Sequence, residues 1–257
     1  MRDITTAERR HRDYLRRRGL KVGQAYEARL IRLRRQEVQR VLELCRNYDD
    51  PEMAASVVQA NIDESYLGDW WQGLTLAAGL PMAKSTARDL NKSKEAEDEG
   101  IWTRQLRDYA RKRAGENIVI VQGTLKDALC DILADELEGE IGISVEELTK
   151  RVYRQYNSHL LKWQCRRIAQ MECMVGMAEA GAEAAGTLDV KFTKQWCCSG
   201  LDNTRKTHQA MDGVEVDEQE LFTLPEGALM QYPHDNTYNP PAAEIINCAC
   251  DVIRRPK

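Results

Sequence analysis

Apolar side chains recur at helical spacing through much of the first 186 residues, and this periodicity constrains the fold more than any other feature. From Ala25 to Cys45, apolar residues return every three to five positions, while arginines lie mostly between them. This spacing puts the apolar residues on one face of an amphipathic helix. Only seven prolines and a 6% share of aromatic residues fit the same pattern. The sequence therefore predicts a mostly helical N-terminal region.

Several other segments are compatible with helix. They are residues 8–18, 51–83 and 101–112, with 84–99 as an exposed connection between the last two. Gly19 and Gly23 are expected to interrupt the first of them. Pro51 is expected to end the helix that begins at Ala25, because the residue before a proline is pushed out of the helical region. The apolar run 118–121 is compatible with a strand or with the start of a buried helix.

Two later helices have clearer signals. Ser144 and Glu147 form a capping-box pattern, in which each side chain can bond a free backbone N–H at a helix start. Residues 160–185 combine a stripe of large apolar residues with many alanines, which favours a second helix.

The composition and the spacing of apolar residues change at Gly186. Val190, Phe192 and Trp196 alternate as in a strand, and glycines, prolines and asparagines follow. Residues 244–252 are expected to form the last strand. The predicted fold class is α+β: a mostly helical N-terminal region, then a small C-terminal domain with a short sheet. The expected divisions are 1–120, 121–186 and 187–257.

Charge is distributed unevenly along the chain. Residues 1–50 contain 14 Lys and Arg against 8 Asp and Glu, so they carry +6, while the remainder carries −10. A basic segment of this kind favours an N-terminal arm that orders on an acidic partner, either nucleic acid or an acidic protein surface. The arginines that suit contact with phosphate are Arg9, Arg12, Arg16, Arg17 and Arg18.

The sequence also limits the compartment. It has no run of the roughly 18–20 apolar residues that a membrane span needs, and its N-terminus begins with charge instead of an apolar signal core. We therefore expect a soluble protein made in the cytoplasm, without a membrane partner. The eight cysteines are scattered or close-set, so reduced thiols are expected.

Cysteine and histidine gather near the C-terminus. His208, Cys248 and Cys250 are candidate zinc ligands, and the fourth ligand would be Cys197, Cys198, His234 or Asp235. On a strand, however, the side chains of Cys-x-Cys lie about 7 Å apart, so a shared zinc needs a bend between them. The alternative is that both cysteines are reduced core residues and that His208 donates a hydrogen bond within the 202–205 turn.

The same segment also contains the residue types of a catalytic site. Cys197 or Cys198 with His208 has the composition of a nucleophile and base, and Asp202 would orient the histidine. No Gly-x-Ser-x-Gly, His-Glu-x-x-His or P-loop pattern accompanies them. We therefore expect no catalytic residues and a protein that is not an enzyme.

The C-terminal third contains an ordered set of residues with a recognisable spacing. They are Trp196, Asp202, Arg205, His208, Asp212, Gly213, Pro233, Asp235, Asn247, Cys248 and Cys250. Their order resembles the C-terminal domain of the Mu F-like head morphogenesis proteins of bacteriophages. The resemblance covers roughly residues 125–257. It departs from the family at Ala249, where arginine is usual, and it keeps only Ala169 and Glu172 of an upstream Ala-Arg-Thr-Glu.

The resemblance implies a function in particle assembly. It implies a low-copy minor capsid protein of the virion or procapsid, assembled in the cytoplasm of the host bacterium. Its expected partners are the portal protein and the major capsid protein, with double-stranded DNA as a further candidate. Some toxins carry a domain of this family fused to a separate catalytic domain. The competing interpretation is a zinc-dependent protein that binds or processes nucleic acid.

Overall fold

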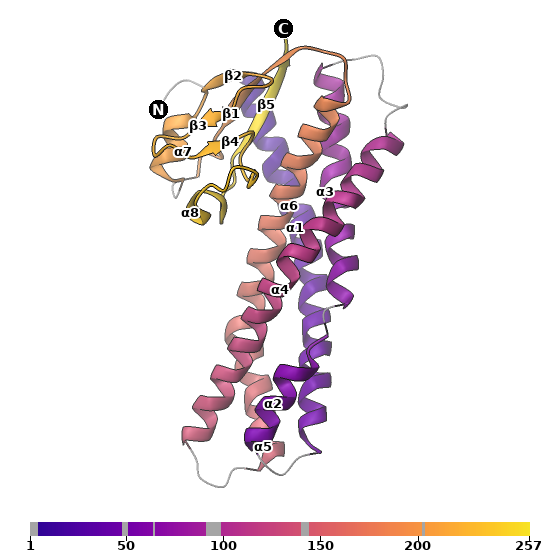
Figure 1. The fold of residues 1–257 in the computed structure, drawn as a ribbon, viewed down its shortest axis with the longest axis vertical. Coiled ribbons are helices and arrows are strands. Elements are labelled where there is room, and N and C mark those ends of the chain that lie inside the picture. Colours follow the sequence, from indigo (N-terminus) through magenta and orange to yellow (C-terminus); the bar gives the residue numbers. More distant parts are fainter. Residues whose placement is uncertain (1–4, 48–50, 64, 91–98, 140–143, 202–203) are drawn as a thin grey trace. The chain divides into compact units, whose positions relative to one another are not determined.

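The computed structural model describes residues 5–47, 51–63, 65–90, 99–139, 144–201 and 204–257 (Figure 1). The helices of the first part are α1 Thr6–Cys45, α2 Pro51–Asn61, α3 Ser65–Leu90, α4 Glu99–Gly139, α5 Val145–Gln155 and α6 Leu161–Gly186. A short π-helical segment, Tyr156–Leu160, joins α5 to α6. The C-terminal part contains β1 Phe192–Cys197, α7 Lys206–Met211, β2 Glu215–Asp217, β3 Phe222–Thr223, β4 Leu229–Met230, α8 Ala242–Ile245 and β5 Asp251–Pro256. The predicted α+β class is confirmed.

Several predicted helix boundaries are also confirmed. Helix α1 ends at Cys45, and α6 ends at Gly186, where the composition of the chain changes. Ser144 is the N-cap of α5, and its hydroxyl accepts a hydrogen bond from the backbone N–H of Glu147. Local chemistry determines these boundaries, which explains why the sequence indicates them.

The two glycines near the N-terminus do not interrupt α1, which differs from the prediction. A Cβ atom at Gly19 would lie 3.3 Å from the sulfur of Met174, and the Cys173 thiol donates a hydrogen bond to the Gly19 carbonyl. Gly19 therefore allows a close approach between α1 and α6 instead of ending a helix. The N-terminal segment is an ordered part of the fold.

The middle of the chain also departs from the prediction. The block 51–83 is two helices, α2 and α3, and the Asp63 side chain accepts hydrogen bonds from Ser65 at the start of α3. The segment expected as an exposed connection continues α3 as far as Leu90, which is buried. Helix α4 runs unbroken through 118–121, so that run is helical. Tertiary packing outweighs the cost of about 1 kcal/mol for each glycine inside α4.

The described residues divide into two compact units that are each discontinuous in sequence. Unit 1 consists of Met1–Gly23, Gly73–Tyr109 and Gln170–Lys257. Unit 2 consists of Gln24–Gln72 and Ala110–Ala169. Both are built from distant segments, whereas the division expected from sequence was linear, with boundaries after residues 120 and 186.

Unit 2 contains a buried charge. The Arg34 guanidinium is 1% exposed, and it donates hydrogen bonds to the Val121 carbonyl at 3.2 Å and to the Tyr156 hydroxyl at 3.4 Å. Trp70 and Trp71 are both buried, and the Trp70 indole donates a hydrogen bond to the Tyr26 carbonyl. Hydrogen bonds to carbonyl and hydroxyl oxygens offset part of the cost of burying the cation.

Unit 1 contains the sheet. Strand β1 pairs antiparallel with β2 on one side and β5 on the other, and Trp196 lies opposite Val252 (Figure 1). Strands β3 and β4 form a separate pair. One apolar core lies beneath these strands; it consists of Trp196, Cys198, Met211, Phe222, Leu224, Met230, Cys248, Cys250 and Val252. Among the described residues, no helix is both long enough and apolar enough to cross a membrane.

The last predicted strand is wrong in its position. Residues 242–245 form α8, a turn follows at residues 246 and 247, and β5 begins only at Asp251. Asn247 has a φ of 58°, a left-handed conformation that asparagine adopts more readily than most residues. The chain therefore bends just before Cys248 instead of running straight through it.

Close approach of α3 and α6 in unit 1 generates a prediction. A Cβ atom at Gly79 would lie 3.0 Å from the Ala180 Cβ and 3.1 Å from the Gly176 carbonyl oxygen. We expect Gly79→Ala to lower the free energy of unfolding by about 1–3 kcal/mol through overpacking. Gly68→Ala on the same helix, where no atom lies within 4 Å, should raise it by about 0.5–1 kcal/mol. Denaturant titration of both variants measures the difference, and equal effects would contradict the close packing.

Candidate metal centre

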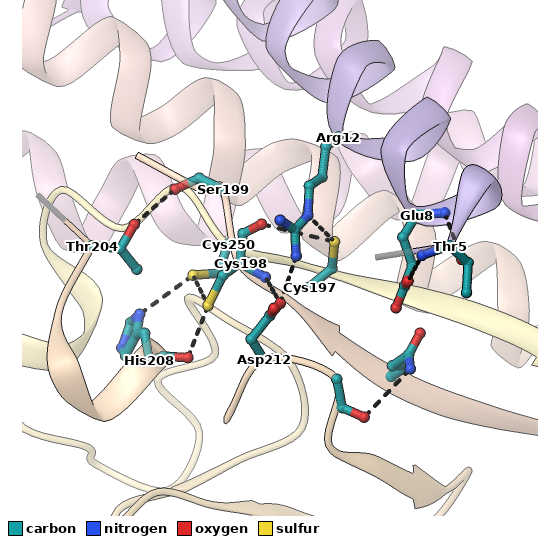
Figure 2. A network of polar contacts seen from close by, with 12 residues as sticks. Thr5, Glu8, Arg12, Cys197, Cys198, Ser199, Thr204, His208, Asp212 and Cys250 are labelled. Atoms are coloured by element: carbon teal, nitrogen blue, oxygen red, sulfur yellow. Dashed lines mark hydrogen bonds and ion pairs between the residues drawn. The ribbon is translucent and has the colours of Figure 1, made fainter. Parts of the chain in front are cut away.

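Three chain segments bring four ligand-bearing side chains together in unit 1. Cys198 directly follows β1, His208 lies on α7, and Cys248 and Cys250 lie in the bend between α8 and β5. Each of the four is at most 5% exposed. The short helix α7 turns the His208 ring toward Cys250, and Cys250 faces Cys198 (Figure 2).

The ligand atoms of this cluster are close to one another. The Nδ1 atom of His208 lies 3.4 Å from the Cys248 sulfur and 3.5 Å from the Cys250 sulfur. These three atoms all lie within 4.8 Å of one another, a spacing that suits a shared metal ion. The Cys250 sulfur lies 3.7 Å from the Cys198 sulfur, although Cys198 is outside the group of three whose ligand atoms all lie within 4.8 Å of one another.

The bend at Asn247 removes the geometric objection raised by the Cys-x-Cys spacing. That objection assumed an extended strand, whereas residues 248–250 precede β5 and follow a turn. The backbone N–H of Cys250 donates a hydrogen bond of 3.3 Å to the Cys248 sulfur. Both thiols can therefore face one point.

The second nitrogen of His208 has a carboxylate partner. Its Nε2 lies 2.9 Å from Oε2 of Glu244, and the Thr207 hydroxyl donates a hydrogen bond to the same oxygen. Glu244 is itself buried, on α8. This pairing directs Nδ1 of the ring at the cysteines. A carboxylate in this position commonly orients a metal-binding histidine.

Burial and contacts between side chains shift the pKa values of His208 and Cys198. Burial lowers the pKa of His208 below the usual value, although Glu244 acts in the opposite direction. The neighbouring Cys250 thiol and burial both raise the pKa of Cys198 well above that of a free thiol. Without a metal, the ring is therefore neutral and Cys198 is protonated, and its thiol donates a hydrogen bond to the His208 carbonyl at 2.8 Å.

The remaining candidates for a fourth ligand have other roles. The Cys197 sulfur accepts a hydrogen bond of 3.3 Å from Arg12, and its pKa is raised to about 11, mainly by burial. The Asp235 carboxylate accepts hydrogen bonds from the backbone N–H groups of Gln231 and Thr237, so it caps a loop. His234 is buried with a φ of 77° and does not belong to the cluster of close ligand atoms.

The other residues of the ordered C-terminal set hold chain segments together. The Trp196 ring packs edge-on against His208 and Phe222. Arg205 donates a hydrogen bond to the Ile246 carbonyl, which joins α7 to the bend. Gly213 has a φ of 85°, a conformation that glycine adopts without steric cost, and Pro233 is buried. Asp202 lies outside the described residues, and so does its expected turn contact with Arg205.

The N-terminal arginines fall into two groups. Arg12 forms an ion pair of 2.7 Å with Asp212, and Asp212 also accepts a hydrogen bond from the backbone N–H of Cys198 (Figure 2). Arg18 donates a hydrogen bond to the Ala77 carbonyl. By contrast, Arg9, Arg16 and Arg17 are exposed. The N-terminal segment, expected to order only on a partner, is thus part of unit 1. Its Arg12 contacts the C-terminal part of the same unit through Asp212.

Three residues at or near the site, Glu244, Arg12 and His11, have partners that the sequence does not indicate. Glu244 lies 36 residues after His208, and Arg12 lies 200 residues before Asp212, so no short-range spacing links either pair. His11 likewise lies 3.2 Å from Asp251 at the start of β5. Only the tertiary fold brings these residues together.

Comparison with known proteins gives a partial similarity. No protein family matches the chain, and no solved structure matches it. The chain is 28% identical over 137 residues to a protein of Enterococcus faecalis (strain ATCC 700802 / V583) that is named NAD(+)--arginine ADP-ribosyltransferase EFV. The match covers 52% of this chain and 26% of the relative, so the chain spans about a quarter of that protein's length.

This match corrects one expectation. The absence of familiar catalytic motifs led us to expect a protein that is not an enzyme. The relative is named as an enzyme, which contradicts that expectation. The absent motifs are those of hydrolases and nucleotide-binding loops, and they do not cover ADP-ribosyl transfer, so their absence could not exclude it.

Proposed function

We propose that the protein is a bacteriophage minor head protein that is incorporated into the procapsid with the portal and acts in head morphogenesis. The observation that carries the proposal is the ordered set from Trp196 to Cys250. Its described members all belong to unit 1. Arg205, Asp212 and Asp235 each bind backbone groups of a neighbouring segment or loop. The spacing that resembles the head proteins therefore corresponds to contacts within one module.

The proposed partners are the portal protein and the major capsid protein. The protein would act by binding at a defined place in the particle of the virion or procapsid. Exposed Arg9, Arg16 and Arg17 also support contact with packaged DNA. Arg9 and Arg16 are seven residues apart on α1, so they lie near the same face of the helix. Arginines at such spacing suit adjacent phosphates of a nucleic-acid backbone.

Incorporation into particles is the first expected outcome. Mass spectrometry of procapsids from a phage that encodes this chain should detect the protein together with the portal. Leu148→Pro should abolish incorporation, because proline removes the hydrogen bond from Leu148 N to the Ser144 carbonyl and costs about 3 kcal/mol or more. Val145→Pro, at the first position of α5, is the control and should be tolerated. Absence of the wild-type protein from both procapsids and virions would refute the proposal.

DNA contact is tested by a charge-matched pair of variants. Replacing Arg9, Arg16 and Arg17 with glutamine should weaken binding to duplex DNA and reduce its salt slope by up to about 3, since each lost phosphate contact contributes about 0.9. Replacing the exposed Arg104, Arg107 and Lys112 of α4 with glutamine removes the same charge elsewhere. Equal losses of DNA affinity in both variants would mean that DNA binding depends only on the net charge of the protein.

Arginine ADP-ribosylation is a second candidate function, favoured by the similarity to the Enterococcus protein. The purified full chain would be incubated with labelled NAD+ and a small guanidine acceptor, with heat-unfolded protein as control. This candidate predicts transfer of labelled ADP-ribose by the native protein alone. Label that stays in NAD+ at the level of the control would eliminate it without affecting the assembly proposal.

A further inference from the structure

We propose that Cys198, His208, Cys248 and Cys250 bind one zinc ion in a closed tetrahedral site. Three thiolate sulfurs and the Nδ1 atom of His208 would supply the four ligands. The inference identifies Cys198 as the fourth ligand and Glu244 as the residue that positions His208. It does not depend on the proposed function.

The distances between ligand atoms agree with tetrahedral zinc. With bonds of about 2.3 Å to sulfur and 2.0–2.1 Å to nitrogen, a tetrahedron separates two sulfurs by about 3.8 Å and a sulfur and a nitrogen by about 3.5 Å. The Cys198 and Cys250 sulfurs are 3.7 Å apart, and binding of zinc would draw the Cys198 sulfur closer to the other two ligand atoms, because it lies outside the group of three that are all within 4.8 Å of one another. The His208 Nδ1 lies 3.4 and 3.5 Å from the sulfurs of Cys248 and Cys250.

The donor set also selects the metal. Three thiolates and one imidazole are soft and intermediate donors, which favour zinc over the oxygen-preferring magnesium and calcium ions. Four protein ligands leave no position for water or substrate. A closed site of this composition is typical of structural zinc.

Neighbouring groups support the coordinated state. The Glu244 carboxylate lies 2.9 Å from Nε2 of His208, which leaves Nδ1 for the metal, and a carboxylate in this place makes the ring a better ligand. The backbone N–H of Cys250 bonds the Cys248 sulfur and stabilises a thiolate there. Zinc would displace the Cys198 thiol proton, which the His208 carbonyl accepts in the metal-free arrangement.

The ion would add a direct link between three segments of unit 1. Its ligands come from the end of β1, from the six-residue helix α7 and from the bend before β5. These segments already share an apolar core, and the metal would fix them to one point. Metal binding of this kind contributes directly to folding.

Metal content of the full chain tests the proposal. Protein purified in reducing buffer without chelator should contain about one zinc per chain by elemental analysis. Cys198→Ser should lose most of this zinc. Cys197→Ser is the adjacent control, because Cys197 faces Arg12, and it should keep the metal. Equal zinc in both variants would exclude Cys198 as the ligand.

Two further measurements keep the test independent of folding defects. Cobalt substituted into the wild-type protein should give the strong visible bands of a tetrahedral site and thiolate charge-transfer absorption. Glu244→Gln should lower zinc affinity by about 10–100-fold in a chelator competition, whereas the exposed Glu226→Gln should not change it. Wild-type protein that binds no zinc, whether as purified or after reduction and titration with zinc, would overturn the proposal. A Cys198–Cys250 disulfide in place of metal would also overturn it.

Discussion

The Asp212 carboxylate is the contact on which unit 1 most depends. Its Oδ1 atom accepts two hydrogen bonds, one from the Arg12 guanidinium and one from the backbone N–H of Cys198. It therefore joins the N-terminal helix, the loop after α7 and the end of β1 at a single point. Arg12 and Asp212 are only 13% and 15% exposed, so solvent screens this ion pair less than it would a surface pair. The position of Cys198, and with it the metal cluster, follows from this arrangement.

Sequence reasoning succeeded where local chemistry determines structure. The cap at Ser144, the end of α6 at Gly186 and the tryptophan strand were all predicted, because each depends on residues a few positions apart. It failed where contacts between segments far apart in the sequence determine the structure. Gly19 has the signature of a helix break, yet it packs against Met174 and Cys173, more than 150 residues away. Arg34 is buried by contacts that its neighbours in sequence do not indicate, since its partners Val121 and Tyr156 lie 87 and 122 residues away.

The candidate site was predicted in part for the same reason. His208, Cys248 and Cys250 were identified from clustering alone, while four residues remained open as the fourth ligand. The extended strand assumed over 244–252 made shared coordination look unfavourable, and the left-handed Asn247 reverses that conclusion. Glu244 could not be found, since it sits on a four-residue helix that the sequence does not signal. The same closed cluster is compatible with either proposed function, because structural metal sites occur in proteins of every class.

The segments that pack together in unit 1 are synthesised at different times. Arg12 is synthesised 200 residues before Asp212. At synthesis rates of 5–20 residues per second, about 10–40 s separate the two. During that interval the nascent α1 has no C-terminal sheet to pack against, so the Arg12 face stays open to solvent and to chaperones. Helix α1 is thus made long before the strands and loops that cover its Arg12 face, and unit 1 can close only after Asp212 has been synthesised.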